Sequence, residues 1–269
     1  MGDIMLTQNF LKSRTSTRDF KEEKIQDITL EKLNKAMLKS VENHGKDDIK
    51  FILIENGQDV YQKLQGLAGY QGVMIDAPSY IALNTLNEEP ATYVKAAYAM
   101  EELITTLNEL NLGNCWITVE DVDDETKKSA IGYDKGDVSI LLAIGNPVDG
   151  SEREHRYDDR LANSDLVFID NLNTPASDED LEQRGLNVIF DYAKYAPSAY
   201  NSQPWRFLVE DDNLSIYIKD FKGNVNLIDA GIIMYYVDEL GKSISSNSNW
   251  DIKPVIDGSE YTYIATKKL

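Results

Sequence analysis

The sequence predicts an α+β protein made of two similar halves, each with helices that cover a small sheet. In the first half, residues 28–43 carry apolar side chains close to helical spacing, and the strand-like run 51–55 follows after a polar break. In the second half, residues 181–198 repeat the helical pattern and lead into the apolar run 207–210. The same order of helix, turn and strand therefore occurs twice.

These two segments align at a single offset without a gap. Placing Phe51 on Phe207 gives an offset of 156 residues (207 minus 51). The same offset sets two further pairs in register: Leu30 with Leu186, and Leu33 with Ile189. An internal duplication produces such a repeat. Two independent domains of similar class are the alternative.

The later segments of the halves also correspond. Residues 93–113 and 227–244 both have the composition of buried helices rich in small residues. Each half then ends in a strand-like run, at 137–147 in the first and at 261–269 in the second. Two such halves can bury helix faces against each other, as a symmetric dimer does. We therefore expect an intramolecular pseudo-dimer.

An acidic stretch connects the halves. It contains Pro175, and Ser177 occupies the position of an N-cap for the helix that follows. We therefore expect a first half over residues 1–165 and a second half over residues 166–269.

The composition excludes several classes of function. The chain has 269 residues, of which 42% are hydrophobic, and its 46 Asp and Glu against 27 Lys and Arg give a net charge of -19. Such a chain repels nucleic acid and anionic lipid, so we expect neither as a partner. No run approaches about 18 apolar residues, and the first residues lack the order of a signal peptide. We therefore expect a cytoplasmic protein.

Few residues are available for metal or nucleophilic chemistry. Cys115 is the single cysteine and lies in an apolar run, which favours a core position. The two histidines, His44 and His155, lie in hydrophilic surroundings and offer little for a metal site or a Ser-His triad. Residues 121–132 imitate a calcium loop, but Thr126 stands where that loop requires glycine. We expect no bound metal.

A cluster near the N-terminus suits a phosphate group. Arg14, Ser16 and Arg18 alternate, so in an extended segment all three would point to one side. Guanidinium groups offer planar pairs of donors for phosphate oxygens, and a short hydroxyl adds one more bond. A merely solvated segment is the alternative.

The stretch APSAYNSQPWRF, residues 196–207, combines two prolines, several hydrogen-bonding side chains and a tryptophan at the end of a helix. Together with RTSTR at residues 14–18, it resembles the nitroreductase family, in the tandem single-chain branch. In that family an Arg-x-Ser-x-Arg segment holds the FMN phosphate and ribityl chain. A Pro-Ser-x-x-Asn-x-Gln-Pro-Trp loop of the opposite subunit lies along the flavin ring. An ordinary loop held by a tryptophan is the alternative.

The resemblance implies one FMN site between the two halves. The first half supplies the phosphate segment, but residues 40–51 lack the loop motif, and the second half has retained only Arg184 before its own helix. Prolines end helices, and short polar side chains hydrogen-bond locally. Four residues of the loop would contact the flavin: Pro197, Ser198, Tyr200 and Asn201. Ser198 and Asn201 would orient and tune the ring, while Trp205 and Phe207 would be buried in the sheet.

The resemblance also implies a basic residue after the strand that closes the first half. Arg156 occupies about this position, with Arg153 and Arg160 as competitors. Surface solvation is the alternative for each of the three.

Two further cofactor-binding candidates lie in the first half. Thr118, next to Trp116 and Ile117, occupies the place where the family approaches the ring with backbone groups. A strand core is the alternative for Trp116. Gln71 lies in GLAGYQG, whose glycine spacing differs from that of a Rossmann dinucleotide site; in the family this region lies near the flavin.

The function that follows is an FMN-dependent oxidoreductase, with NADH or NADPH as the electron donor. Hydride would pass through flavin N5 to a nitroaromatic, a quinone or a similar small molecule by ping-pong kinetics. The flavin carries such chemistry, while the protein binds and orients it. We expect a monomer and leave further dimerisation open. The alternatives are a flavin-binding protein with little turnover and an acidic interaction protein on a degenerate scaffold.

Overall fold

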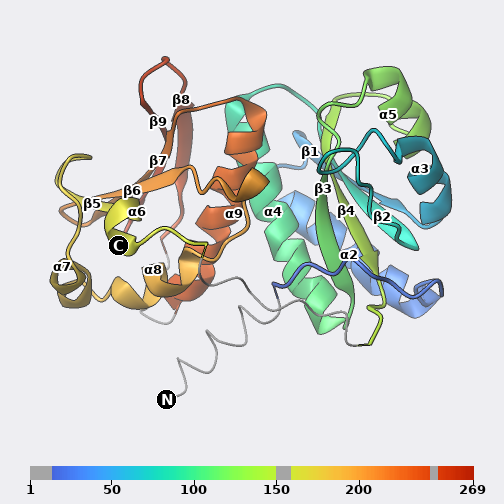
Figure 1. The fold of residues 1–269 in the computed structure, drawn as a ribbon, viewed down its shortest axis with the longest axis horizontal. Coiled ribbons are helices and arrows are strands. Elements are labelled where there is room, and N and C mark those ends of the chain that lie inside the picture. Colours follow the sequence, from blue (N-terminus) through green and yellow to red (C-terminus); the bar gives the residue numbers. More distant parts are fainter. Residues whose placement is uncertain (1–13, 150–158, 243–247) are drawn as a thin grey trace. The chain divides into compact units, whose positions relative to one another are not determined.

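The computed structural model describes residues 14–149, 159–242 and 248–269. These residues form two compact units (Figure 1). We call residues 14–88 and 99–149 the N-terminal unit, and residues 89–98, 159–242 and 248–269 the C-terminal unit. Each unit contains one sheet with its own helices.

The N-terminal unit has a four-stranded antiparallel sheet. Its strand order is β1-β2-β4-β3. The strands are β1 (Ile49–Ile54), β2 (Ser79–Thr85), β3 (Gly113–Thr118) and β4 (Asp137–Gly145). The helices are α2 (Asp27–His44), α3 (Gly57–Leu64) and α5 (Asp124–Ile131). Every residue of β2 is buried, because the strand lies inside the sheet and both of its faces are covered.

The C-terminal unit has a five-stranded sheet in the order β5-β6-β7-β9-β8. Its strands are β5 (Val167–Ile169), β6 (Trp205–Glu210), β7 (Asn213–Lys219), β8 (Asp251–Val255) and β9 (Tyr261–Lys268). Its helices are α6 (Asn163–Leu166), α7 (Asp178–Gln183), α8 (Asn187–Ala193), the short 3-10 helix η1 (Ala199–Asn201) and α9 (Asn224–Gly241). Among the described strands of this sheet, β5 and β6 pair in parallel and the other neighbours pair antiparallel.

The two sheets share one topology. The order β1-β2-β4-β3 in the N-terminal unit is matched by β6-β7-β9-β8 in the C-terminal unit, with β5 added at the edge. In both units a helix precedes the first of these strands, namely α2 before β1 and α8 before β6. The predicted α+β fold with two similar halves in one chain is confirmed.

Helix α4 (Pro90–Glu109) contributes to both units. Residues 90–98 belong to the C-terminal unit and residues 99–109 to the N-terminal unit. Residues 90–98 lie close to α9. A Cβ placed on Gly231 of α9 would lie 2.2 Å from the carbonyl oxygen of Val94. The expected boundary after residue 165 falls inside α6, all of which belongs to the C-terminal unit.

One predicted helix is two helices. The pattern over residues 181–198 indicated a single helix, but Gly185 has φ 68° and separates α7 from α8. The expected cap of Ser177 is confirmed, because its hydroxyl accepts a hydrogen bond from the backbone of Asp180 in a capping box. The break lets α7 and α8 take different directions.

Three residues that we expected in the core or in the sheet are buried there. Cys115, Trp205 and Phe207 are buried, and the Phe207 ring lies 4.9 Å from that of Phe190 on α8. Residues 124–131 form α5, which begins where Asp123 accepts a hydrogen bond from the backbone of Thr126. None of the described helices combines the length and apolarity that crossing a bilayer requires.

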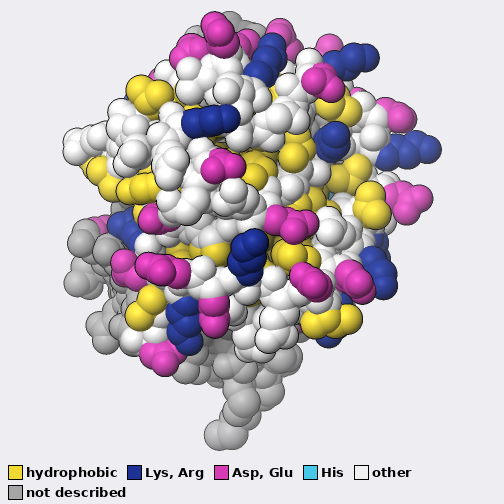
Figure 2. Space-filling model, turned by 90° about the vertical axis from the view of Figure 1, so that its right-hand side faces the viewer, with side chains coloured by type: hydrophobic (Ala, Val, Ile, Leu, Met, Phe, Trp, Pro, Cys, Tyr) yellow, Lys and Arg dark blue, Asp and Glu magenta, His cyan; other side chains and the backbone are white. Residues whose placement is uncertain are grey.

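The surface that carries α3 and α5 has mixed charge. Figure 2 shows acidic and basic side chains interspersed on this face, with hydrophobic side chains between them. The excess of acidic residues therefore does not form a continuous negative patch on this face.

Candidate functional site

The loop between α8 and β6 has an unusual backbone. Tyr200, Asn201 and Gln203 all have positive φ, at 55°, 54° and 46°. Residues other than glycine adopt this left-handed conformation at a cost of about 1–3 kcal/mol each when it is sparsely populated, and they keep it only where neighbouring groups enforce it. Three such residues within four positions mark the loop as a candidate site.

Side-chain hydrogen bonds enforce this conformation. The Ser198 hydroxyl accepts a bond from the Gln203 backbone N–H at 3.0 Å. The buried Gln203 amide donates to the carbonyl oxygen of Asp159 and accepts from the backbone N–H of Leu161 at 2.9 Å. The Asn201 amide also donates to the Asp159 carbonyl, at 3.0 Å. Residues 159–161 thus hold the loop through the Asp159 carbonyl and the Leu161 N–H.

Arg160 contacts the same loop. Its guanidinium donates to the carbonyl oxygens of Ala196 at 3.2 Å and Tyr195 at 3.3 Å, and to the side-chain oxygen of Asn201. Its Nε is buried and has no hydrogen-bond partner within the described part of the chain. Burial lowers the pKa of Arg160 below its ordinary value. The loop therefore carries a partly buried cation.

The predicted basic residue Arg156 and its competitor Arg153 lie outside the described residues. Arg160, the other competitor, lies within the described residues and contacts the loop. The sequence contained the candidate but gave no reason to prefer it.

Two predicted flavin contacts on the loop are accessible. Tyr200 is 73% exposed, and Asn201 is exposed as well. Pro197 and Ser198 are half-buried at the end of the α8 segment. All four predicted loop residues are therefore together, in a geometry fixed by their neighbours.

Asp229 on α9 supports the loop and was not predicted. Its carboxylate is 2% exposed and accepts a hydrogen bond from the backbone N–H of Ala199 at 2.9 Å. Burial raises its pKa to about 7. The signal in the sequence was a single acidic residue at the start of a long apolar run, LIDAGIIMYY, from residue 227.

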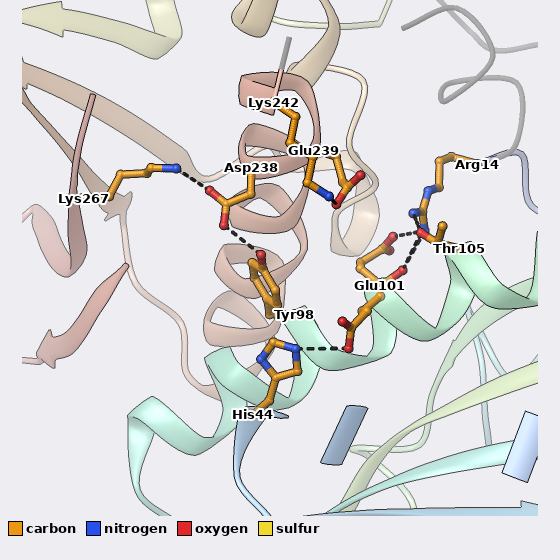
Figure 3. A network of polar contacts seen from close by, with 10 residues as sticks. Arg14, His44, Tyr98, Glu101, Thr105, Asp238, Glu239, Lys242 and Lys267 are labelled. Atoms are coloured by element: carbon orange, nitrogen blue, oxygen red, sulfur yellow. Dashed lines mark hydrogen bonds and ion pairs between the residues drawn. The ribbon is translucent and has the colours of Figure 1, made fainter. Parts of the chain in front are cut away.

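The three residues predicted to bind a phosphate, Arg14, Ser16 and Arg18, have different surroundings in the N-terminal unit. Arg14 forms an ion pair with Glu101 on α4, with Nη1 and Oε2 2.6 Å apart and both side chains at most 2% exposed. Figure 3 shows this pair together with Thr105, which also accepts a bond from Arg14. Burial raises the pKa of Glu101, although Arg14 and a hydrogen bond from Trp116 oppose the rise. Ser16 and Arg18 are exposed instead.

Backbone contacts fix the segment that carries this trio. The N–H of Thr17 donates to the carbonyl oxygen of Asn114 at 2.7 Å. A Cβ on Gly113 would lie 2.4 Å from the Thr17 hydroxyl, so only glycine permits this approach. The segment therefore lies along the start of β3, and Ser16 and Arg18 have fixed positions on the surface.

Gln71 and Thr118 also lie in the N-terminal unit, on neighbouring segments. Gly69, in the loop that carries Gln71, donates its N–H to the Thr118 carbonyl oxygen at 2.8 Å. Gln71 is exposed with φ 54°, Thr118 is half-buried, and Ile117 lies in the core. The structure thus brings these two predicted residues into one region.

Comparison with known proteins identifies the family. A family model described as "Putative TM nitroreductase" matches residues 7–239. The chain belongs to this nitroreductase family. The match confirms the resemblance that the two motifs predicted and, with it, the oxidoreductase class. A comparison with curated proteins found no match.

The fold of this nitroreductase is similar to that of solved structures. A "putative nitroreductase" from Thermotoga maritima has a TM-score of 0.58 and 19% identity, over 100% of this chain and 94% of that one. A nitroreductase with bound FMN from Bacteroides fragilis has a TM-score of 0.47 and 15% identity, over 56% of this chain and 92% of that one. An FMN-dependent nitroreductase from Clostridium difficile has a TM-score of 0.44 and 22% identity, over 65% and 94%.

Proposed function

We propose that this nitroreductase is an FMN-dependent NAD(P)H oxidoreductase that reduces a small molecule such as a nitroaromatic or a quinone. The observation that carries the proposal is the strained loop at residues 198–203. Its conformation is enforced by side chains, and it leaves Tyr200 and Asn201 exposed. Strain maintained in this way is typical of ligand-binding sites.

The residues of the C-terminal unit fit a flavin. Tyr200 offers an exposed aromatic surface, and the exposed Asn201 amide, which bonds Asp159 and Arg160, has a second N–H and a second lone pair for a flat ring edged by carbonyl and N–H groups. The buried Nε of Arg160 is a donor without an acceptor among the described residues. A buried donor of this kind calls for a partner, and a ligand oxygen would satisfy it.

In the N-terminal unit, Arg18 and Ser16 fit the FMN phosphate. Both are exposed on a segment that the backbone bond of Thr17 holds in place. Arg14 would have to leave Glu101 to bind a phosphate, and breaking a buried ion pair costs about 3–5 kcal/mol. We therefore propose that Arg18 neutralises the charge of the phosphate and that Arg14 has a structural role.

When bound, FMN supplies two-electron chemistry, accepting hydride at N5 and passing the electrons to an acceptor. The chain's own residues bind and orient. Ser198 and Gln203 hold the loop, Asn201 presents its amide to the ring, and Arg18 neutralises the phosphate. Thr118 and Gln71 are further candidates for contact with the ring. None of these roles requires a side-chain nucleophile.

The visible absorption spectrum of the purified protein tests the proposal. We expect flavin bands near those of FMN, identification of FMN after heat release, and bleaching by NADH or NADPH under anaerobic conditions. A yellow protein that neither donor bleaches would indicate a flavin-binding protein with little turnover. A colourless protein that binds no added FMN would reject the proposal in favour of an interaction protein.

A further inference from the structure

A chain of hydrogen bonds through two buried side chains of α9 leads to the loop. The backbone N–H of Lys222 donates to the side-chain oxygen of Asn226 at 2.7 Å. The amide of Asn226 donates to one carboxylate oxygen of Asp229 at 3.4 Å, and the other oxygen accepts the Ala199 N–H at 2.9 Å. Asn226 is 5% exposed and Asp229 is 2% exposed. Both oxygens of a buried carboxylate are thus committed to specific donors.

The buried position of Asp229 is energetically unfavourable for a carboxyl group. Helix α9 has 18 residues, of which 14 are buried, and most of these are apolar. Within the described residues, burial and these two hydrogen bonds are the influences on the Asp229 carboxyl, and no cation contributes. A buried carboxyl group without a cation destabilises a fold unless its hydrogen bonds compensate. Asp229 is therefore a candidate for a role other than stability.

The bond to Ala199 reaches the point where the loop is strained. Ala199 begins η1, and the next two residues, Tyr200 and Asn201, have left-handed backbones. The bonds of Ser198, Arg160 and Gln203 act on the following part of the loop. Asp229 is the side chain that holds the backbone N–H at the start of the strained turn.

We propose that Asp229 is a positioning residue that holds Ala199 and thereby presents Tyr200 and Asn201 in the conformation that receives the flavin. The inference rests on the proposed function for its ligand, but the positioning itself does not require FMN. Asp229 touches no reacting atom and acts through Ala199.

Three variants separate positioning from stability. Asp229→Leu removes both acceptors and replaces them with a larger apolar group branched at the same carbon; the control variant carries the same change in size. Asp229→Asn keeps an acceptor oxygen for the Ala199 N–H, but it removes the charge and replaces the weaker acceptor of Asn226, at 3.4 Å, with an NH2 group. Asp238→Leu is the control, because Asp238 is also a carboxylate of α9 with partners of its own, Tyr98 at 2.7 Å and Lys267 at 2.6 Å.

Two measurements are made on each full-length variant. Amide hydrogen exchange of Ala199 in the FMN-free protein reports whether the loop is held. Titration of added FMN, followed by quenching of its fluorescence, reports binding. We expect Asp229→Leu to speed exchange at Ala199 and to raise the Kd for FMN, each by about tenfold or more, which corresponds to the loss of one good hydrogen bond.

The other two variants should leave the loop unchanged. We expect both quantities to stay within about threefold of the wild-type values in Asp229→Asn and Asp238→Leu, although Asp238→Leu lowers overall stability. Unchanged exchange at Ala199 in Asp229→Leu, or the same loss in Asp238→Leu, would overturn the inference. If Asp229→Leu does not fold, Asp229→Asn decides. A folded Asp229→Asn protein that loses both the slow exchange at Ala199 and FMN binding would also overturn the inference.

The two proposals fail separately. If the wild-type protein binds no FMN, the proposed function is rejected, while exchange at Ala199 still tests Asp229. If FMN binds equally well to all variants, only the role of Asp229 is rejected.

Discussion

Arg14 and Glu101 form a buried ion pair that joins the segment before α2 to the C-terminal part of α4, across 87 positions of sequence. The pair changes the interpretation of the RTSTR motif. The first arginine is committed to a carboxylate within its own unit, while Ser16 and Arg18 remain on the surface. The two arginines should therefore respond differently to substitution.

Arg14→Ala should lower the free energy of unfolding by about 3–5 kcal/mol, because it leaves Glu101 buried without its cation. Arg18→Ala should leave that free energy nearly unchanged and should weaken FMN binding by about 1.5–3 kcal/mol, the range for hydrogen bonds to charged groups. Urea unfolding and FMN titration measure the two effects. Arg184→Ala, at an exposed position in the second half, is the control for both. Equal stability losses in Arg14→Ala and Arg18→Ala would contradict this division of roles.

The stability of the wild-type protein should carry a pH dependence from Asp229. Burial raises its pKa from 3.8 to about 7 in the folded protein. The folded state therefore binds this proton more tightly than the unfolded state, and the stabilisation is full below pH 3.8 and lost as pH rises through about 7. Between these values the wild-type free energy of unfolding, minus that of Asp229→Asn, should fall by about 1.4 kcal/mol per pH unit. Urea unfolding from pH 5 to pH 8 measures this difference, and a flat difference would show that Asp229 titrates normally.

Gly231→Ala should destabilise the C-terminal unit. The new methyl group would lie 2.2 Å from the Val94 carbonyl oxygen and 2.8 Å from the Ala97 Cβ, so α9 and α4 would have to separate. Overpacking of this kind costs about 1–3 kcal/mol or more. Gly132→Ala is the matched control, because its Cβ would meet nothing within 4 Å and only its left-handed backbone is strained. Thermal unfolding of the two variants should give the larger loss for Gly231→Ala.

FMN should bind with a stoichiometry of one per chain. The phosphate segment with Arg18 occurs in the first half and the Pro-Ser loop in the second, and neither motif is repeated. Heat-released flavin, counted by absorbance against protein, tests this expectation. A ratio near two would mean that each half holds a cofactor with residues not considered in our proposal.

Steady-state kinetics should be ping-pong. We propose that the loop covers one face of the flavin, so that donor and acceptor use the other face in turn. Initial rates at several fixed acceptor concentrations should then give parallel double-reciprocal lines. Intersecting lines would require donor and acceptor to be bound together, and the single-face proposal would be withdrawn.

The sequence predicted the repeated order of helix and strand, although not the division of the second helix at Gly185, because the apolar spacing around Leu33 and Ile189 records the burial of one helix face. It did not predict β2 or β7. In β2 every residue is buried, so polar residues such as Asn84 interrupt the apolar pattern without being exposed. Short strands of this kind are recognised only from their pairing partners.

Only some contacts of the candidate site can be inferred from the sequence, for a related reason. The loop motif brought Ser198, Tyr200 and Asn201 together locally, and local order is what a sequence pattern records. The partner of Arg14 lies 87 positions away and that of Ala199 lies 30 positions away. Alternation along an extended segment cannot reveal which side chain meets a distant carboxylate.

The shared order of strands β1-β2-β4-β3 and β6-β7-β9-β8 has a consequence for how this molecule can vary. In a homodimer each substitution appears twice, so a residue that improves one surface also alters its symmetric copy. In a single chain with two related halves, each substitution appears once. One half can give up a motif while the other keeps it, and selection can act on Arg18 in the first half and Asn201 in the second without a compromise between identical copies.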